Sequence, residues 1–480
     1  MRIFLIGWNN TKREFYDVAL ELQKRGHKVL YWVGGDNEKS IEISKLKLNQ
    51  TIFHRHSDAV SGIRPREFKG IEFAPPGEDF IKQFYETESV LLTMKLFEKM
   101  RKVALEKKHF FHSMLQYWHG VIKKLKPDVI IFALWPHSGY NFLVYSLAKK
   151  LGIKTIMFEY ARIADRLLLI NDIKIGSLYL KKEIKRNKDK NFKLEDLSPD
   201  IKKYYNEQVE KGVYTIPPDV KALSNRYSGI NLLLLKLKMI VVSILDFSIF
   251  KKTYNYIIKQ FKSNLKKEYT SLQKKPDLSK KYIYVALHYQ PECTTSPLGG
   301  VFVDQVLMVK ILSAAVPKDW VIYVKEHPYQ WLPYGLSYFN YRYEGYYKSI
   351  AKLKNVQLIP LKTNPVELIN RAQAVASVTG TTCWEAVLRL KPALVFGYAW
   401  YRDCPGVFRV NSVDSCQKAI EKILSGYKIN RQRIINYLAS LDKISIHGYF
   451  EKITKEQSSL TETECTAHML KALVQEIEGK

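Results

Sequence analysis

The chain has 480 residues, and its 76 basic and 47 acidic side chains leave a formal charge of +29 at pH 7. A composition that is 46% hydrophobic and 13% aromatic can bury sizeable cores, which excludes a globally disordered chain. Five cysteines without a CxxC pair argue against a disulfide framework or a zinc ribbon and favour a reducing compartment. The opening residues, MRIFLIG, lack the apolar run of a signal peptide, so we expect a cytoplasmic protein.

Strands and helices alternate in the first part of the chain. Residues 2–7 form a short apolar run typical of a buried strand, residues 12–25 carry apolar side chains at helical spacing, and residues 27–33 predict a second strand. The same order returns at 127–134, 140–151 and 153–159. Because a strand, a helix and a strand within about 33 residues indicate a parallel sheet, we expect a Rossmann-like domain over residues 1–170.

Residues 171–275 interrupt this pattern, because they are rich in lysine and poor in strand signals. We expect a helical, basic insertion. Its residues 229–250 are the most apolar stretch of the chain, but two lysines and an aspartate make them a poor transmembrane helix. Two interpretations stay open: a segment lying on an anionic membrane, with lysines at the headgroups, or a buried helical hairpin with a solvated basic face. Nucleic acid is disfavoured as a partner, because no recognition helix, zinc finger or base-stacking pattern occurs.

A second series of strands and helices begins at residues 281–287. Further elements are expected at 302–315, 321–325, 356–359, 365–372, 374–378, 383–390 and 393–396. These predict a second Rossmann-like domain over residues 276–425, and C-terminal helices over 426–480. The predicted fold class is therefore α/β, with two Rossmann-like parallel-sheet domains facing a central cleft, a helical basic insertion and a helical C-terminal tail.

Ligands of open parallel sheets bind beyond the carboxyl ends of the strands. One such loop of the second domain contains Thr379, Gly380, Thr381 and Thr382, directly before a helix. Free N–H groups and the positive dipole end of a helix suit a phosphate, as do hydroxyl groups. Glu385, one helical turn further, is placed to accept hydrogen bonds from ribose hydroxyls. The alternative interpretation is ordinary helix capping by Thr381 or Thr382.

A second loop of this domain reads Lys325, Glu326, His327 and Pro328. The proline turns the chain and sets the histidine at the mouth of the loop, where it can donate to a phosphate oxygen and supply charge for a leaving nucleotide. A lone histidine–proline pair would indicate only a locally satisfied histidine. Two such loops in one predicted sheet, with one strand expected between them, favour a nucleotide site.

A long loop from residue 288 to residue 300 follows the first strand of this domain and is dense in polar residues and glycines. We expect it to contact the donor phosphate or the acceptor. Its substrate-binding candidates are His288, Gln290, Glu292, Gly299 and Gly300, and the pattern does not say which of them acts.

In the first domain, Glu159 closes an apolar strand and is interpreted as a general base or nucleophile. The alternative is a structural carboxylate paired with Arg162, which is also a candidate substrate contact. His137 and Asp165 are further catalytic candidates. Walker A, GxSxG, HExxH and paired DxD motifs are absent from the sequence, which weakens NTPase, hydrolase and metal-dependent interpretations. We expect no metal and no cofactor if histidine, lysines and a helix start supply the positive charge.

Four blocks of the second half, LHYQPECTTSPLGG, YVKEHP, SVTGTTCWEAV and KPALVFG, occur in this order. They resemble the bacterial capsule polysaccharide biosynthesis family, which includes Kdo-transferase-type enzymes among the two-Rossmann (GT-B) glycosyltransferases. The second and third blocks also resemble bacterial sialyltransferases that use CMP-sugars. The resemblance implies that His327 and the Thr379–Thr382 loop hold the donor's phosphate, and that Glu385 holds its ribose. It gives no role to Glu159.

The resemblance implies a glycosyltransferase, and the basic, apolar insertion leads us to expect that it is peripheral on the inner face of the bacterial inner membrane. It would transfer Kdo or a related 2-keto acid sugar from a CMP donor to a lipid-linked or growing glycan, with the donor in the second domain and the acceptor in the first. The implied partners are a nucleotide sugar, a glycan or glycolipid acceptor and an anionic membrane surface, without nucleic acid. The alternatives are an enzyme similar to UDP-sugar 2-epimerases, a polyol-phosphate transferase and a non-catalytic membrane or nucleic-acid binder.

Overall fold

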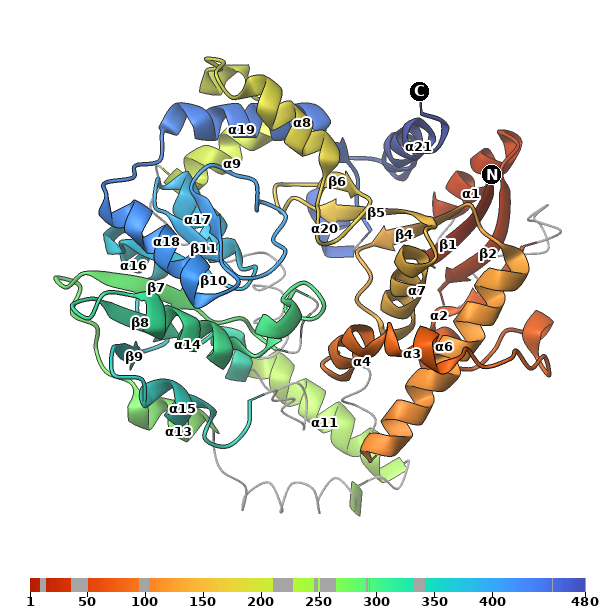
Figure 1. Cartoon of the computed structure of the whole chain (residues 1–480), viewed down its shortest axis with the longest axis horizontal. Coiled ribbons are helices and arrows are strands. Elements are labelled where there is room, and N and C mark those ends of the chain that lie inside the picture. The colour runs from red at the N-terminus through yellow and green to blue at the C-terminus, as the bar shows by residue number, and fades with distance from the viewer. Residues whose placement is uncertain are drawn as a thin grey trace. The chain divides into compact units, whose positions relative to one another are not determined.

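The computed structural model describes residues 1–8, 14–35, 51–94, 103–209, 228–245, 249–250, 265–290, 292, 294–331, 342–450 and 452–479. The chain divides into two compact units. The first unit contains Met1–Ile201, Ser296–Gly300 and Ile435–Lys480, and the second contains Lys202–Thr295 and Val301–Ile434. Each unit is built around one sheet (Figure 1).

The sheet of the first unit has seven strands in the order β13-β6-β5-β4-β1-β2-β3. Their bounds are β1 (Arg2–Trp8), β2 (Lys28–Gly34), β3 (Ile52–Arg55), β4 (Val129–Leu134), β5 (Lys154–Tyr160), β6 (Arg166–Ile170) and β13 (Ile446–His447). The strands from β5 to β3 are parallel, as the sequence predicts. Strands buried on both faces appear as continuous apolar runs, and residues 3–6 of β1 are fully buried.

The edge of this sheet departs from the expected parallel pattern, because β6 and β13 are antiparallel to their neighbours. Only residues 161–165 join β5 to β6. A parallel crossover needs a dozen or more residues, so this short link can only form an antiparallel pair. The sequence analysis predicted neither of these two strands, nor β3.

Helices of the first unit flank this sheet. They are α1 (Glu14–Lys24), α2 (His56–Ser61), α3 (Glu78–Lys82), α4 (Tyr85–Leu92), α6 (Ala104–Leu125), α7 (Gly139–Lys150), α8 (Leu178–Asn187), α20 (Lys452–Gln457) and α21 (Glu462–Glu478), with short 3-10 turns at Arg66–Phe68 and Leu194–Asp196. Two more helices, α9 (Pro199–Val209) and α19 (Arg431–Ile444), continue from one unit into the other.

The sheet of the second unit has six parallel strands in the order β12-β11-β10-β7-β8-β9. They are β7 (Tyr282–Ala286), β8 (Val321–Lys325), β9 (Val356–Leu358), β10 (Ala374–Ser377), β11 (Ala393–Val395) and β12 (Val407–Arg409). The helices α13 (Leu265–Leu272), α14 (Gln305–Ala315), α15 (Tyr346–Ala351), α16 (Pro365–Arg371), α17 (Thr381–Leu388) and α18 (Val413–Leu424) accompany it, with 3-10 turns at Gly300–Val303 and Pro328–Trp331. The prediction of one strand between the two phosphate loops is confirmed, because β7 lies between β8 and β10.

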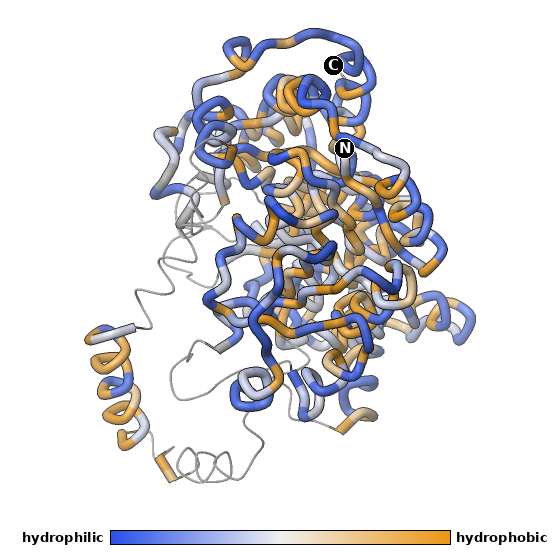
Figure 2. Tube along the Cα trace, turned by 90° about the vertical axis from the view of Figure 1, so that its left-hand side faces the viewer, coloured by the Kyte–Doolittle hydropathy of each residue, from blue (hydrophilic) through white to orange (hydrophobic). Residues whose placement is uncertain are grey.

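The predicted α/β class with two sheets is thus confirmed, whereas the cleft between the two domains stays a prediction. Every element that the structure describes between residues 171 and 275 is helical. One of them, α11 (Gly229–Leu245), is composed mainly of apolar residues (Figure 2). Most of its apolar side chains are exposed, which does not agree with a buried helical hairpin. Residues 210–227, 246–248 and 251–264 of the predicted basic insertion lie outside the described residues. Among the described helices, none combines the length and the apolarity that a membrane span requires.

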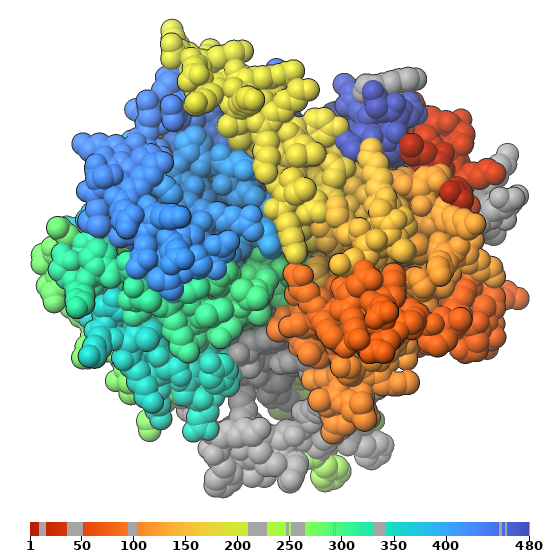
Figure 3. Space-filling model, in the orientation of Figure 1, coloured from red at the N-terminus to blue at the C-terminus, as the bar shows by residue number. Residues whose placement is uncertain are grey.

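The C-terminal segment is built into the first unit. Asn187 of α8 donates to the Ser440 hydroxyl of α19 at 3.0 Å, and Lys443 of α19 pairs with Glu183 of α8 at 2.7 Å. Figure 3 shows α8, in yellow, on the surface beside the blue α19. The strand β13 then pairs with β6, and α21 packs on α1. The last part of the chain therefore completes the fold of the first unit.

Candidate functional site

Three loops of the second unit meet at the carboxyl edge of its sheet, because the strands β10, β7 and β8 that precede them are neighbours. The contact between the first two loops is direct. The backbone N–H of Thr379, after β10, donates to Nε2 of His288, after β7, at 3.0 Å. The loop after β8 joins through the backbone of His288, whose carbonyl accepts from Arg342 at 2.8 Å while Arg342 also holds Glu326. The predicted convergence of these loops is confirmed.

His288 is fixed in one tautomer by this contact. A ring nitrogen that accepts from a backbone N–H carries no proton, so the proton of neutral His288 lies on Nδ1. Nδ1 donates to Glu292 at 2.8 Å, and the Thr294 hydroxyl donates to the same carboxylate oxygen. Although burial alone would raise it, these hydrogen bonds lower the pKa of Glu292. The loop thus has an ionised carboxylate against a neutral, oriented imidazole.

Gly380 lets the backbone pass close to His288. A Cβ at this position would lie 2.7 Å from the Ser377 hydroxyl and 3.3 Å from His288 Nε2. Gly380 is also the N-cap of α17, with Thr381 and Thr382 as the first two helical residues. The alternative interpretation of these threonines as helix caps is therefore wrong. Their N–H groups belong to the first turn, where a helix has no internal acceptor for them.

The predicted hydroxyl-rich loop divides into two parts. The Thr379 hydroxyl donates to the Thr294 carbonyl at 2.9 Å, so this side chain is engaged within the protein. Thr381 is exposed and Thr382 is half-buried at the start of α17. Glu385 is half-buried one turn along, where burial raises its pKa to about 7 against the opposing attraction of Arg389. An anion and a hydroxyl-rich ligand can both be held at this helix start.

The loop after β8 supplies donors, but its histidine is neutral. The N–H of Tyr329 donates to Nδ1 of His327 at 3.2 Å, which leaves the proton on Nε2. Burial lowers the pKa of His327 to about 4. The expected hydrogen-bond donor is therefore present, whereas the expected positive charge is not. Lys325 is buried, donates to the Thr363 carbonyl at 2.7 Å and has a pKa lowered to about 8 by burial. Pro328 is exposed and begins the next turn.

A buried ion pair beneath these loops was missed by the sequence analysis. Arg342 holds Glu326 through two hydrogen bonds, Nε to Oε2 at 2.9 Å and Nη2 to Oε1 at 3.0 Å, and both side chains are fully buried. Tyr347 donates to Glu326 at 2.6 Å, and the N–H of His327 donates to it at 2.7 Å. Although burial alone would lower it, Glu326 raises the pKa of Arg342. No local motif marks Arg342, so only the folded chain identifies this support.

The remaining candidates of the long loop have different surroundings. Gln290 is buried and exchanges hydrogen bonds with Gln330, the Gln290 N–H donating at 3.0 Å and its carbonyl accepting at 3.2 Å. Its side-chain oxygen accepts from Gln305 at 3.0 Å. Gln290 therefore supports the loop from inside. Gly299 and Gly300 fall in the segment Ser296–Gly300, which clusters with the first unit.

The candidates of the first unit lie at the carboxyl edge of its sheet. Glu159 is buried in β5 opposite Leu168 of β6, and His137, after β4, is exposed with Nδ1 2.8 Å from the Trp135 carbonyl. The guanidinium of Arg162 is exposed and lies 5.5 Å over the ring of Tyr160. The structure brings these residues to one edge without assigning a role to any of them.

Asp165 is bound to the C-terminal segment. Its carboxylate accepts from Nδ1 of His447 at 2.7 Å and from the Ser458 hydroxyl, and its carbonyl accepts from the Gly448 N–H at 2.8 Å. Although burial alone would raise it, these side-chain hydrogen bonds lower the pKa of Asp165. The sequence analysis missed His447, because 282 residues separate it from its partner.

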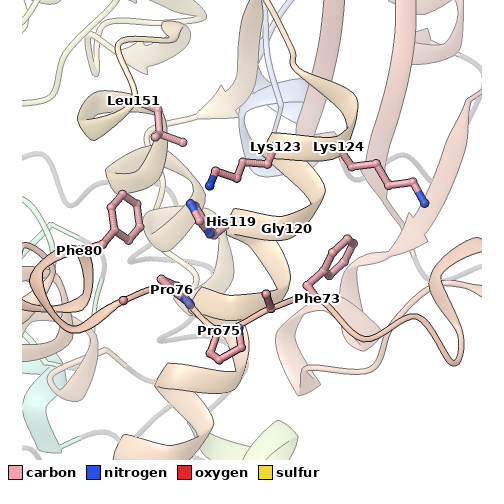
Figure 4. Close-up of a pocket in the computed structure, with 11 residues that line it drawn as sticks. Phe73, Pro75, Pro76, Phe80, His119, Gly120, Lys123, Lys124 and Leu151 are labelled. Atoms are coloured by element: carbon pink, nitrogen blue, oxygen red, sulfur yellow. The ribbon is translucent and has the colours of Figure 1, made fainter.

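A hollow of about 650 Å³ in the first unit lies elsewhere (Figure 4). It is lined by residues that include Phe73, Phe80, His119, Lys123 and Leu151. The ends of α6 and α7 that line it precede β4 and β5, so the hollow lies toward the amino edge of the sheet. Because ligands of such sheets bind at the carboxyl edge, this hollow is not the predicted site. Among the described residues, no three His, Cys, Asp or Glu side chains are grouped so as to hold a metal ion.

Residues 294–438 match the family described as capsule polysaccharide biosynthesis protein. The predicted resemblance to that family is confirmed over this stretch, which contains His327, Thr379 to Thr382 and Glu385. The matched stretch spans 145 of the 480 residues and contains the loops after β8 and β10. No curated protein matches the chain.

Solved structures resemble the chain only remotely. The beta Kdo 2,7 transferase KpsC of Thermosulfurimonas dismutans is 12% identical over 75% of this chain and 89% of its own, with a TM-score of 0.34. The UDP-GlcNAc 2-epimerase of Methanocaldococcus jannaschii is 13% identical over 92% of this chain and 98% of its own, with a TM-score of 0.25. That of Neisseria meningitidis, bound to UDP-GlcNAc, is 12% identical over 99% and 100%, with a TM-score of 0.26. These similarities are too low to decide between the two activities.

Proposed function

We propose that the protein is a glycosyltransferase of capsule or other surface polysaccharide synthesis, which transfers a sugar from a nucleotide-activated donor to a glycan acceptor. One observation carries the proposal. The stretch that matches the capsule family contains the loops after β8 and β10, and these meet the loop after β7 at one edge of the second sheet.

The geometry gives each loop a task toward the donor. The N–H groups at the start of α17 and the Nε2–H of His327 donate to the phosphate, and the carboxylate of Glu385 accepts from the ribose. Lys325 adds positive charge nearby. Such fixed donors stabilise the negative charge that develops on the departing nucleotide. The proposal includes no metal and no cofactor.

The finer parts of the proposal concern the substrates and the location. The donor is CMP-linked Kdo or a related 2-keto acid sugar, and the acceptor is a lipid-linked or growing glycan bound by the first unit. Glu159 is the general base or nucleophile, supported by its burial at the carboxyl edge of the first sheet. The enzyme works at the inner face of the bacterial inner membrane.

A thermal-shift panel of CMP, CDP, UDP, GDP and ADP on wild type and His327→Ala tests the donor site. A nucleotide at about 100 times its Kd adds roughly 2.7 kcal/mol of stability. We expect a shift selective for CMP that His327→Ala removes and His137→Ala, an exposed histidine of the first unit, leaves in place. A shift selective for UDP, with turnover of a UDP-sugar in the absence of acceptor, would instead indicate an epimerase. No shift with any nucleotide would contradict the proposed donor site.

A further inference from the structure

The helix α11 presents a broad apolar surface to solvent. Nine of its aliphatic side chains are exposed: Ile230, Leu233, Leu234, Leu237, Ile240, Val241, Val242, Ile244 and Leu245. The exposed fractions reach 72% at Ile230 and 75% at Leu245. A soluble helix turns such residues toward a core, so an exposed set of this size indicates an interaction surface.

Eight of these nine residues form one continuous face. At 100° per residue they fall within an arc of roughly 140°, from Ile240 at one border to Leu245 at the other, and we call these eight the apolar arc. The ninth, Val242, falls roughly 60° beyond Leu245. The opposite side of the helix contains Leu232, Leu235 and Met239, which are half-buried, and the buried Ser243. Figure 2 shows the mainly orange colour of α11, interrupted by blue.

The two lysines and the asparagine of α11 lie along the borders of the apolar arc. Lys236 falls roughly 40° beyond Ile240, and Lys238 falls roughly 20° beyond Leu245, with Asn231 next to it. Both lysines are exposed. An apolar face with a lysine along each border is the pattern of a helix lying in the plane of a membrane interface, where the long side chains reach the headgroups.

The charge of the sequence that contains α11 identifies the kind of surface that the helix fits. From Gly229 to Lys267 the sequence contains eight lysines and a single acidic residue, Asp246. A second copy of the chain would place the same positive borders against each other, which is unfavourable. Anionic lipid headgroups neutralise them, and each lysine near such a surface contributes to binding.

We propose that α11 lies flat on an anionic bilayer, with the apolar arc below the headgroups and Lys236 and Lys238 among the lipid phosphates. With 17 residues the helix is about 25 Å long, enough to lie along the surface as an anchor. The proposal identifies α11 as the surface through which the protein contacts the membrane at its proposed location. It rests on α11 alone and not on the donor site.

Vesicle flotation of the full-length protein tests the proposal. The vesicles contain either phosphatidylcholine alone or equal parts of phosphatidylcholine and phosphatidylglycerol. We expect wild type to bind the anionic vesicles at least about tenfold more tightly, with the difference reduced at high salt. Absence of binding to the anionic vesicles would overturn the proposal.

Two pairs of variants separate the apolar and the basic contributions. Leu237→Asn with Val241→Asn, in the middle of the apolar arc, should weaken binding to the anionic vesicles about tenfold or more. Leu178→Asn with Leu424→Asn, which removes two leucines exposed elsewhere, should leave this binding unchanged.

The lysines are tested in the same way. Lys236→Gln with Lys238→Gln should weaken binding to the anionic vesicles about fivefold per lysine, and Lys318→Gln with Lys354→Gln should have little effect. Equal binding by the arc variant and wild type would also overturn the proposal.

Two further measurements keep the outcome unambiguous. The CMP-dependent thermal shift of each variant should equal that of wild type, which shows that the second unit is folded. If wild type binds the vesicles but shows no CMP-dependent thermal shift, the proposed donor site is contradicted and the proposed membrane surface is not. Self-association that the arc variant abolishes, without vesicle binding, would show that a second copy covers α11 and would overturn the proposal.

Discussion

Glu385 is the residue whose protonation state should govern how tightly the donor site holds a nucleotide. Burial raises its pKa to about 7, so the carboxylate forms as the pH rises through neutrality. Only the ionised group accepts hydrogen bonds with both oxygens from ribose hydroxyls. We therefore expect the affinity for CMP to increase severalfold between about pH 6 and pH 8, measured by calorimetry. Glu385→Gln, which cannot ionise, should remove that increase. An unchanged pH profile in this variant would assign the titration to another group.

The pair of Arg342 and Glu326 should be among the most sensitive contacts of the second unit. Arg342→Met leaves a buried carboxylate without its counter-charge, and such changes cost about 3–5 kcal/mol. Thermal unfolding followed by circular dichroism should show this loss. When Glu326→Gln is added, the charge is removed too. The amide oxygen can still accept from the N–H of His327, and the amide NH2 can donate to the Tyr347 hydroxyl, which then accepts. The double variant should therefore be more stable than Arg342→Met alone. Additive losses would show that the two side chains do not act as a pair.

The sequence indicated some of these residues and not others, for a physical reason. His327 and Gly380 come within three residues of the end of an apolar run, so their place at the strand ends can be read locally. The neutral state of His327 depends on burial and on the N–H of Tyr329, which only the folded chain supplies. Arg342 likewise acquires its role through contacts with Glu326 and His288, which no spacing in the sequence encodes.

At the scale of elements, the start of α17 depends on the absence of a side chain at Gly380. In Gly380→Ala the new Cβ would meet the Ser377 hydroxyl at 2.7 Å, so either that side chain or the helix start must shift. We expect a loss of about 1–3 kcal/mol in stability and at least tenfold weaker CMP binding. Adding Ser377→Ala removes the closest contact and should restore most of both. Thermal shifts with and without CMP measure the two effects. Persistence of the full defect in the double variant would place the strain at His288 instead.

Elements with continuous apolar runs or helical periodicity could be predicted, and elements defined only by their partners could not. The strand β8 was predicted over its observed residues, because its five residues are an apolar run ended by a lysine and a turn. The strand β13 has only two residues, and its pairing with β6 is antiparallel and distant in the sequence. Such a strand carries no periodic signal of its own.

At the scale of the whole molecule, the sequence suggested a helical tail and the structure shows what that tail does. Residues from 435 onward belong to the first unit, where they add a strand to its sheet and cover it with α21. Without β13, the strand β6 would lie at the edge of the sheet and expose unpaired backbone groups. The pairing of β13 with β6 covers part of that edge. The donor loops, in contrast, are supported by residues of the second unit. Changes at the tail should therefore affect stability and not nucleotide binding.

Asp165 offers a direct test of this separation. Asp165→Asn weakens the contacts of the carboxylate with His447 and Ser458, so we expect a loss of about 2 kcal/mol in the stability of the first unit at pH 7. Because its pKa is lowered in the folded chain, this contribution is present above the usual pKa of an aspartate and is lost as the pH falls below it. Asp128→Asn, in an exposed pair with Arg2, should cost at most about 1 kcal/mol and serves as the matched control.

The same variant decides between a structural and a catalytic role for Asp165. A carboxylate that only fastens the C-terminal segment to the sheet should leave the CMP-dependent thermal shift within error of wild type, and sugar transfer should fall only as far as the folded fraction falls. A carboxylate that acts on the substrate should instead abolish transfer at temperatures where the variant is fully folded. We expect the first result, because the carboxylate of Asp165 accepts hydrogen bonds from His447 and Ser458 of the first unit itself. Transfer that is lost while the unfolding transition is unchanged would contradict it.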